Sequence, residues 1–198
     1  MDNTRTPVLY IVGNYNIDLV MGTLTHWPAQ GTEMMLEHSA LRPGGSAGNC
    51  ALAAAAMQLP HCTVGCQGDD AFTPWLAAQF PGGSARWPQY PCETSLTVAI
   101  THPNKERSFL SNHGHITRLT AGDVLSQLPA AAGEGDIVLL CGTFLCTGLL
   151  SDYPQLLATL RQRGFTLAVD TGWPPQGWSD PLRHEVDRWL GDCDWLLL

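Results

Sequence analysis

The stretch VLYIVGNYNID, residues 8–18, joins a short apolar run to a glycine and a group of polar side chains. An apolar run of this length, bounded by Gly13, is typical of a buried strand. In open α/β sheets, ligands bind just beyond the carboxyl ends of the strands. The carboxylate of Asp18 can accept hydrogen bonds from two neighbouring hydroxyls there, and an amide such as that of Asn16 can donate and accept. An ordinary turn, in which Asn and Asp satisfy local backbone groups, explains the pattern equally well.

A second segment, PGGSAGN at residues 43–49, precedes the alanine-rich residues 50–57. Glycines followed by strong helix formers predict a loop that leads into a helix. The backbone at Gly44 and Gly45 can approach a ligand closely, and a helix N-terminus attracts oxygen-rich groups. Asn49, on the first turn, is expected to face the same space as Asp18. A glycine-rich connector without a ligand is the alternative, because the segment is neither G-x-G-x-x-G nor a Walker A loop.

The remaining pattern alternates between strands and helices, which indicates βαβ units around a parallel sheet. Two insertions interrupt this rhythm: residues 19–42, with short apolar pieces such as residues 34–36 that suggest small strands, and residues 95–110, with two extended segments. They suit a small β flap on an α/β core. Further strands are predicted at residues 62–66, 137–141, 165–170 and 194–198, and helices at residues 74–80, 149–163 and 180–190, with another starting at Thr120.

Composition limits the classes of protein to consider. The length of 198 residues fits one domain, or one domain with a small appendage, and a content of 44% apolar and 14% charged residues is typical of a globular chain. The net charge of −8 argues against sequence-independent nucleic-acid binding, which needs a basic face. No signal pattern, no apolar run of about 20 residues and no CxxC pair occur. We therefore expect a protein of the reducing cytoplasm with free thiols and no membrane partner.

Other chemistry-bearing residues have simpler explanations. Cys62 with Cys66, and His113 with His115, lack the further ligands of a tetrahedral metal site, so no metal is predicted. Residues 64–72 are expected to be structural. Asp170 ends a predicted strand at the ligand edge, where it either bonds a substrate or caps the following turn. Four tryptophans can stack on a ligand, although such residues more often fill gaps in a core: Trp173, Trp178, Trp189 and Trp195.

In this order and spacing, the motifs resemble the N-terminal two-thirds of the PfkB/ribokinase family of carbohydrate kinases. The family's G-x-x-N-x-D motif matches residues 13–18. Its proline- and glycine-containing lid segment matches residues 28–32, and its G-G-x-x-x-N signature matches residues 44–49. Its V-G-x-x-G-x-D element matches residues 64–70. Two later matches are partial: Lys105-Glu106-Arg107 for G-E-R, and residues 170–178 for D-P-N-x-R-x-x-x-W.

The resemblance implies a ribokinase-like, Rossmann-type parallel sheet flanked by helices, with a β-strand lid formed by segments at about 19–42 and 95–110 of a single truncated domain, 1–198. It implies an ATP- and Mg²⁺-dependent kinase for a monosaccharide, nucleoside or related alcohol, with lid closure excluding water. Some relatives dimerise through the lid, which makes a homodimer an expectation here. The implied substrate-binding residues are Asn16, Asp18, Gly44, Gly45, Asn49 and Asp170.

One family motif is missing from the sequence. The D-T-x-G-A-G-D segment that supplies the catalytic base and the anion hole does not occur, and Asp170-Thr171-Gly172 lacks its Gly-x-Gly-Asp continuation. We therefore expect the C-terminal part of the fold to be missing and the chain alone to be inactive, with no assignable base. The alternative is a non-catalytic sugar-binding or dimerising remnant. An oxidoreductase of similar layout is disfavoured because no G-x-G-x-x-G follows the first strand.

Overall fold

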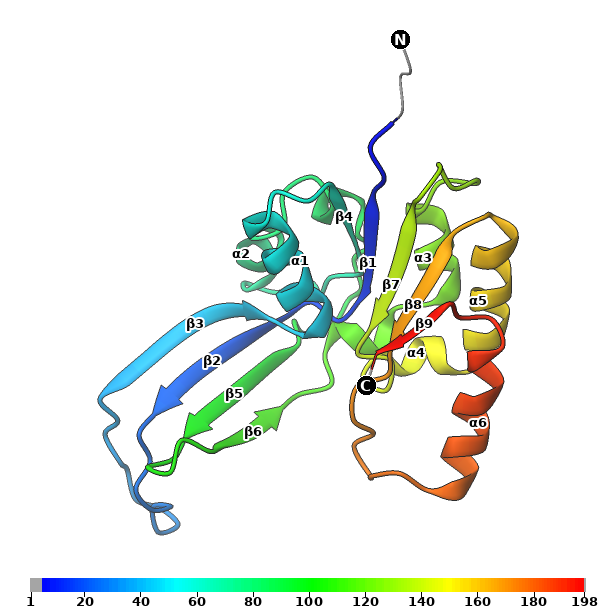
Figure 1. Cartoon of the computed structure of the whole chain (residues 1–198). Coiled ribbons are helices and arrows are strands. Elements are labelled where there is room, and N and C mark those ends of the chain that lie inside the picture. Colours follow the sequence, from blue (N-terminus) through cyan, green and yellow to red (C-terminus); the bar gives the residue numbers. More distant parts are fainter. Residues whose placement is uncertain (1–4, 198) are drawn as a thin grey trace.

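The computed structural model describes residues 5–197 and contains two β-sheets (Figure 1). The larger sheet is entirely parallel, with neighbouring strands in the order β4-β1-β7-β8-β9. Helices cover both of its faces, so the α/β prediction is confirmed. Its strands are β1 (Leu9–Gly13), β4 (His61–Val64), β7 (Ile137–Cys141), β8 (Thr166–Asp170) and β9 (Trp195–Leu197).

Strand β1 shows why the central strands are apolar on both faces. Successive side chains of a strand point to opposite faces. Val12 belongs to the core under α3 (Ala121–Gln127), α5 (Tyr153–Gln162) and α6 (Asp180–Leu190), whereas Ile11 packs towards α1 (Ser46–Ala56) and α2 (Thr73–Ala78). Both side chains are fully buried. A strand covered twice therefore appears as an uninterrupted apolar run.

The helix predicted at residues 149–163 is two helices, α4 (Thr147–Leu150) and α5. The physical reason is Pro154, which has no N–H to donate to the carbonyl four residues earlier and occupies the first turn of α5. Gly164, with φ of +88°, follows the last turn of α5, next to the predicted helix end at residue 163. Its N–H bonds the Arg161 carbonyl at 2.9 Å and the next N–H, that of Phe165, bonds Leu160 at 3.3 Å, which is a Schellman motif.

The second sheet has four strands in the order β3-β2-β5-β6 and extends away from the core (Figure 1). The insertions around residues 19–42 and 95–110 supply it. The strand suggested at residues 34–36 does not form, and Met35 is 84% exposed. The β2–β3 ladder ends at the pair Gly22–His38, so this segment has no neighbouring strand to bond. We call this sheet the lid sheet: β2 (Asn16–Gly22), β3 (His38–Gly44), β5 (Leu96–Thr101) and β6 (Arg107–Ser111).

The strand order places a topological switch point at the carboxyl edge of the larger sheet, between β1 and β7, and we call this position the crevice. The connection from β1 to β4 runs through α1 on one face, whereas β7 connects to β8 through α5 on the other face. Such a reversal between adjacent strands separates the loops above them, and ligands of open α/β sheets bind there. The carboxyl ends of β1 and β7, at Gly13 and Cys141, are paired in register. The polar segment that follows Gly13 therefore begins at this crevice.

Candidate functional site

Three polar side chains form a hydrogen-bonded chain directly after Gly13. The Asn14 amide donates to Oδ1 of Asn16 at 3.4 Å, and the Asn16 amide donates to Oδ1 of Asp18 at 2.8 Å. Asn14 and Asn16 are buried and Asp18 is half-buried. Burial raises the pKa of Asp18, against the opposing effect of the Asn16 hydrogen bond. An ordinary turn was one of the two interpretations of Asn16 and Asp18, but these residues begin the lid strand β2 and so connect the sheet edge to the lid sheet.

Two glycines leave room for this polar chain. Gly44 is the register partner of Asn16, and a Cβ on Gly44 would collide with the carboxylate of Asp18. Gly45 has φ of +86° and precedes α1; a Cβ there would collide with the Asn14 carbonyl and with Oδ1 of Asn16. The structure therefore brings Asn16, Asp18, Gly44 and Gly45 together, because only glycine allows β3 and the start of α1 to approach so closely.

Asn49 and Asp170 are placed differently from these four residues. Asn49 lies on the first turn of α1, where its N–H bonds the Gly45 carbonyl at 2.8 Å, but its side chain is exposed and, within residues 5–197, makes no hydrogen bond. Asp170 ends β8 at the carboxyl edge, and its Oδ1 accepts the N–H of Gly172 at 2.9 Å. That contact is the turn-capping role considered for Asp170 from the sequence.

A cavity of about 210 Å³ opens beneath the polar face of the lid sheet. Asn16 reaches it from β2, Thr97 from β5 and Ser111 from β6, and the Thr97 and Ser111 hydroxyls are 2.9 Å apart. Asp18 pairs with Thr97 in register, so its side chain extends the same polar row. The cavity is also lined by Ser95, Asn112, His113, Ile116, Thr117, Leu145 and Pro175. Hydroxyl and amide groups therefore dominate the lid side of this cavity.

Sequence reasoning missed several of these residues. Asn14 lies within the motif but was not singled out; it is 2% exposed, and its Oδ1 has no hydrogen-bond partner among the described residues. It packs against Gly142, just past β7. In β5, Thr97 alternates with the apolar residues Leu96 and Val98, a period-two signal that separates the two faces of a strand, whereas β6 reads Arg-Ser-Phe-Leu-Ser and shows no such alternation. That alternation was available in the sequence but did not show which sheet the strands join.

His115 ties the lid sheet to the crevice. It is fully buried in η2 (His115–Arg118), where its ring satisfies two backbone groups. Its Nδ1 accepts the N–H of Ser95 at 2.9 Å, and its Nε2 lies 3.0 Å from the Tyr15 carbonyl, which can only accept. The ring is therefore neutral with its proton on Nε2. Burial lowers the pKa of His115 to about 4.

Asp70, which was predicted to be structural, connects the start of α2 to the residues that enter β5. Its carboxylate accepts the Thr94 N–H and hydroxyl, each at 2.7 Å, and the Phe72 and Thr73 N–H groups at 3.0 and 3.2 Å. Burial acts to raise the pKa of Asp70, but these hydrogen bonds outweigh it and the pKa is lowered. The start of α2 is thereby fastened to the residues that enter β5.

The remaining candidates take mainly structural roles. Cys66 is buried and its thiol donates to the His115 carbonyl at 3.2 Å. Across residues 5–197, no three Cys, His, Asp or Glu side chains gather as metal ligands would. Trp189 packs on Tyr153 in the core and Trp178 on Phe144, whereas Trp173 and Trp195 are 74% and 52% exposed.

Comparison with known proteins identifies the family. The model of the pfkB family carbohydrate kinases matches residues 8–198, which is nearly the whole chain. The chain belongs to the pfkB family. No curated protein matches it in sequence. The resemblance inferred from the motifs is therefore confirmed for the family as a whole.

Solved structures share the fold at low sequence identity. Ribokinase from Arabidopsis thaliana, complexed with ribose and ATP, is similar with a TM-score of 0.68 and 18% identity, covering 97% of this chain and 60% of that one. Fructokinase from Xylella fastidiosa with bound ATP has a TM-score of 0.71 and 16% identity, and the match covers 97% of this chain and 61% of that one. Fructokinase from Vibrio cholerae O395 in apo form has a TM-score of 0.67 and 20% identity, and the match covers 97% of this chain and 63% of that one. This pfkB chain thus spans about 60% of the length of the first two.

None of the helices between residues 5 and 197 has the length and apolar character needed to cross a bilayer.

Proposed function

We propose that this pfkB chain binds a monosaccharide, or the sugar part of a nucleoside, through the polar chain Asn14–Asn16–Asp18 and the adjoining Gly44–Gly45 backbone. The observation that carries the proposal is the meeting of these groups at the crevice between β1 and β7, beside the hydroxyl-lined cavity under the lid sheet. A carboxylate whose Oδ2 accepts no hydrogen bond from the described residues, together with amides fixed by burial, is suited to neighbouring hydroxyls. From the family motifs, we also propose that Asn49 and Asp170 contribute, from the first turn of α1 and from the carboxyl end of β8.

Asn14 supports this proposal independently of the family. A buried acceptor without a partner is costly in a protein interior, and native structures rarely leave one without a reason. Oδ1 of Asn14 is such an atom among the described residues, and it lies at the crevice against Gly142. A hydroxyl of a bound polyol would supply the missing donor.

We further propose that the chain does not transfer phosphate by itself. Ribokinase and fructokinase structures hold ATP, and phosphate transfer requires an anion hole, a base and a metal site. The sequence has no D-T-x-G-A-G-D segment. The chain therefore offers no anion hole or base of the family's kind, and we propose that its chemistry is confined to the alcohol side of the reaction. A cytoplasmic location accords with the seven free thiols.

The binding proposal is tested by titrating ribose, fructose and adenosine into the 198-residue chain with calorimetry. We expect one of them to bind and Asp18→Asn to weaken it by about 10- to 100-fold, because a charged acceptor becomes neutral and gains a misplaced donor. Asp187→Asn, on the exposed side of α6, is the matched control and should bind normally. Equal affinity for the Asp18 variant and the parent chain would contradict the proposed site.

Turnover is measured in the same samples by following ATP consumption with the sugar that binds. Binding without turnover is the expected result. Sustained phosphorylation of the sugar by the purified chain would overturn the proposal that it is catalytically incomplete, while leaving the binding site intact.

The outer face of the lid sheet favours a homodimer as the oligomeric state, and we propose one. Leu41, Leu19, Val98 and Leu110 form a row across all four lid strands, opposite the polar row. Leu41 and Leu110 are 38% and 55% exposed. Exposed apolar patches on small domains mark interaction surfaces, and a second copy offers the same row to pack against it.

A further inference from the structure

Two thiols from distant parts of the chain meet beside the crevice. Cys50 lies on the second turn of α1, and Cys141 is the last residue of β7, 91 residues later. The Cys141 thiol donates to the Cys50 sulfur, and the two sulfur atoms are 3.9 Å apart. All seven cysteines are free, and among the described residues no other two thiols are joined by a hydrogen bond. Neither thiol belongs to the proposed sugar-binding set, so the pair has no role in the site described above.

Small side chains on α1 allow this close approach. Ala47 and Ala51, on the face of α1 that packs on the sheet, are almost completely buried. A Cβ on Gly13, the register partner of Cys141, would lie only 3.3 Å from the Cβ of Ala47. Cys50 is three residues after Ala47 and is therefore on the same side of the helix. The meeting of the two sulfurs thus follows from the way α1 packs on the carboxyl ends of β1 and β7.

The remaining separation and the unequal exposure of the thiols suit a cross-link. The sulfur atoms of a disulfide are about 2 Å apart, so these two atoms must approach by about 2 Å. A change of rotamer at Cys50 can supply this approach, because rotation about Cα–Cβ moves a sulfur atom farther than that. Cys50 is half-buried and accessible to a small oxidant, whereas Cys141 is 2% exposed. Burial and the neighbouring Cys50 sulfur raise the pKa of Cys141, which therefore remains a protonated thiol.

A peroxide can oxidise this pair in two steps. In the first step, the Cys50 thiolate attacks hydrogen peroxide: a sulfur–oxygen bond forms, the oxygen–oxygen bond breaks, hydroxide leaves, and Cys50 becomes a sulfenic acid. In the second step, the Cys141 sulfur attacks the Cys50 sulfur, and the hydroxyl on Cys50 leaves with the Cys141 proton as water. The two thiols are thereby oxidised to a disulfide and one peroxide is reduced to two molecules of water.

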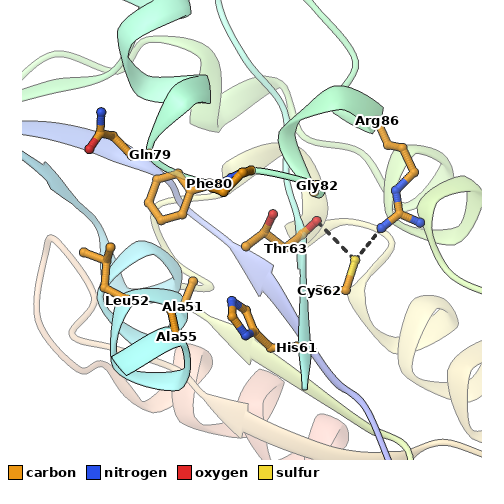
Figure 2. A pocket seen from close by; sticks show the side chains of 12 residues that line it. Ala51, Leu52, Ala55, His61, Cys62, Thr63, Gln79, Phe80, Gly82 and Arg86 are labelled. Carbon is orange, nitrogen blue, oxygen red and sulfur yellow. Dashed lines mark hydrogen bonds between the residues drawn. The ribbon is translucent and has the colours of Figure 1, made fainter. Parts of the chain in front are cut away.

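Cys62 shows what distinguishes this pair from the other thiols. It is half-buried on β4, beside a cavity of about 360 Å³, and Figure 2 shows its sulfur in contact with the Arg86 guanidinium. Its thiol also donates to the Thr63 carbonyl at 3.7 Å. None of these contacts is to a second thiol, so oxidation of Cys62 would end at the sulfenic acid. Cys62 is therefore a matched control for Cys50.

We propose that Cys50 and Cys141 are a site of reversible oxidation, at which a peroxide converts the two thiols into a disulfide that ties α1 to β7. Thiol–disulfide exchange with a small reducing thiol returns the pair to its free state. A cross-link between residues so far apart in the sequence restricts the unfolded chain, and a bond that the native fold accommodates therefore raises the stability of the folded chain.

The experiment uses the full 198-residue chain, which is reduced, freed of reductant and treated with an equimolar amount of hydrogen peroxide. The remaining thiols are alkylated under denaturing conditions and counted by mass spectrometry. We expect five alkylated thiols, two fewer than the seven of the reduced chain, and one intramolecular cross-link between the peptides of Cys50 and Cys141. The oxidised chain should have a Tm higher by about 5 °C or more. A reducing thiol should restore the original count and Tm.

Three variants and an unfolded sample are the controls. Cys50→Ser, at a half-buried position, should fold and form no cross-link. Cys141→Ala should stop at the Cys50 sulfenic acid, which dimedone traps. Cys62→Ser should form the cross-link as the parent chain does. The parent chain unfolded in urea should give mixed pairings, because its thiols are no longer held together.

Four outcomes would overturn the proposal. They are the absence of a cross-link in the folded parent chain, a cross-link that omits Cys50 or Cys141, a cross-link between two copies of the chain, and a lower Tm after oxidation. The last would show that the bond forms only when α1 leaves its native position on the sheet.

Discussion

Gly44 and Gly45 are adjacent, but their missing side chains serve different purposes. At Gly44 the space is taken by the carboxylate of Asp18, which is the end of a side chain. At Gly45 it is taken by the Asn14 carbonyl, which is backbone, and φ of +86° further excludes other residues. A side chain can rotate away from an added methyl group, whereas a packed backbone cannot.

This difference predicts opposite results for two alanine variants. Gly44→Ala should displace Asp18 and weaken sugar binding by at least about tenfold, with less than about 1 kcal/mol lost in stability. Gly45→Ala should destabilise the protein by about 2 kcal/mol or more, because it strains the backbone and shifts β1 from α1. Calorimetric titration and urea unfolding measure the two effects. Similar stability losses in both variants would refute the distinction.

His115 is the residue whose titration should be visible in stability. Its pKa is lowered from 6.5 to about 4 in the folded chain, so the unfolded chain takes up the proton first as the pH falls. Protonation would also place an N–H on Nδ1, facing the Ser95 N–H. The stabilisation present at pH 7 is therefore lost progressively from about pH 6.5 down to about pH 4.

We predict a loss of about 3 kcal/mol in unfolding free energy over this range from His115 alone. His115→Gln, which does not titrate, should flatten that part of the pH profile, and His184→Gln on exposed α6 should not. Asp70, with a lowered pKa, adds a loss only at more acidic pH, below its unfolded value. Urea unfolding at a series of pH values decides the matter, and an unchanged slope in the His115 variant would contradict the assignment.

At the scale of elements, the lid sheet is held by the residues at which its strands leave the core. β2 follows β1 after two residues, β3 runs directly into α1, and β5 is entered through Thr94 and Ser95. Each entry is fixed by polar groups that accept or donate hydrogen bonds: Asn16, the Gly45 backbone, and Asp70 with His115. The lid sheet is therefore coupled to the crevice through its strand ends.

Asp70→Asn should test this coupling. In the variant, an amide NH₂ donor takes the place of a carboxylate oxygen that accepts from Thr94. We therefore expect the free energy of unfolding to fall by about 2 kcal/mol and hydrogen exchange at the start of β5 to become faster. Asp69→Asn, an exposed neighbour whose carboxylate bonds only Gln89 among the described residues, should change stability by less than about 0.5 kcal/mol. Equal losses in the two variants would show that the Asp70 contacts are not specific to the lid entry.

At the scale of the whole molecule, one lid sheet presents two chemically distinct faces. The polar row of Asp18, Thr97 and Ser111 faces the cavity, and the apolar row that includes Leu19 and Leu110 faces outward. Period-two alternation along four paired strands produces this separation. A homodimer through the apolar row would cover that face and leave the polar face available for a ligand.

Leu110→Glu is the variant that tests the proposed homodimer. A carboxylate placed in the apolar row should shift the chain towards monomer in light scattering, because a buried, unpaired charge is costly. Phe109→Glu lies on the adjacent residue of the same strand and the opposite face, so it should leave the dimer intact. A parent chain that is monomeric at all concentrations would contradict the dimer proposal.

The sequence by itself determined the α/β class, most strand and helix positions, and the family, because these depend on local periodicity, capping and short motifs. Asn16, Asp18, Gly44 and Gly45 were found in this way, and the structure brings them together. The sequence alone could not determine which side chains from distant segments meet: Asn14 against Gly142, Thr97 beside Asp18, or His115 between Ser95 and Tyr15. Only the order of strands in the two sheets decides those contacts, because register and burial depend on neighbours remote in the chain.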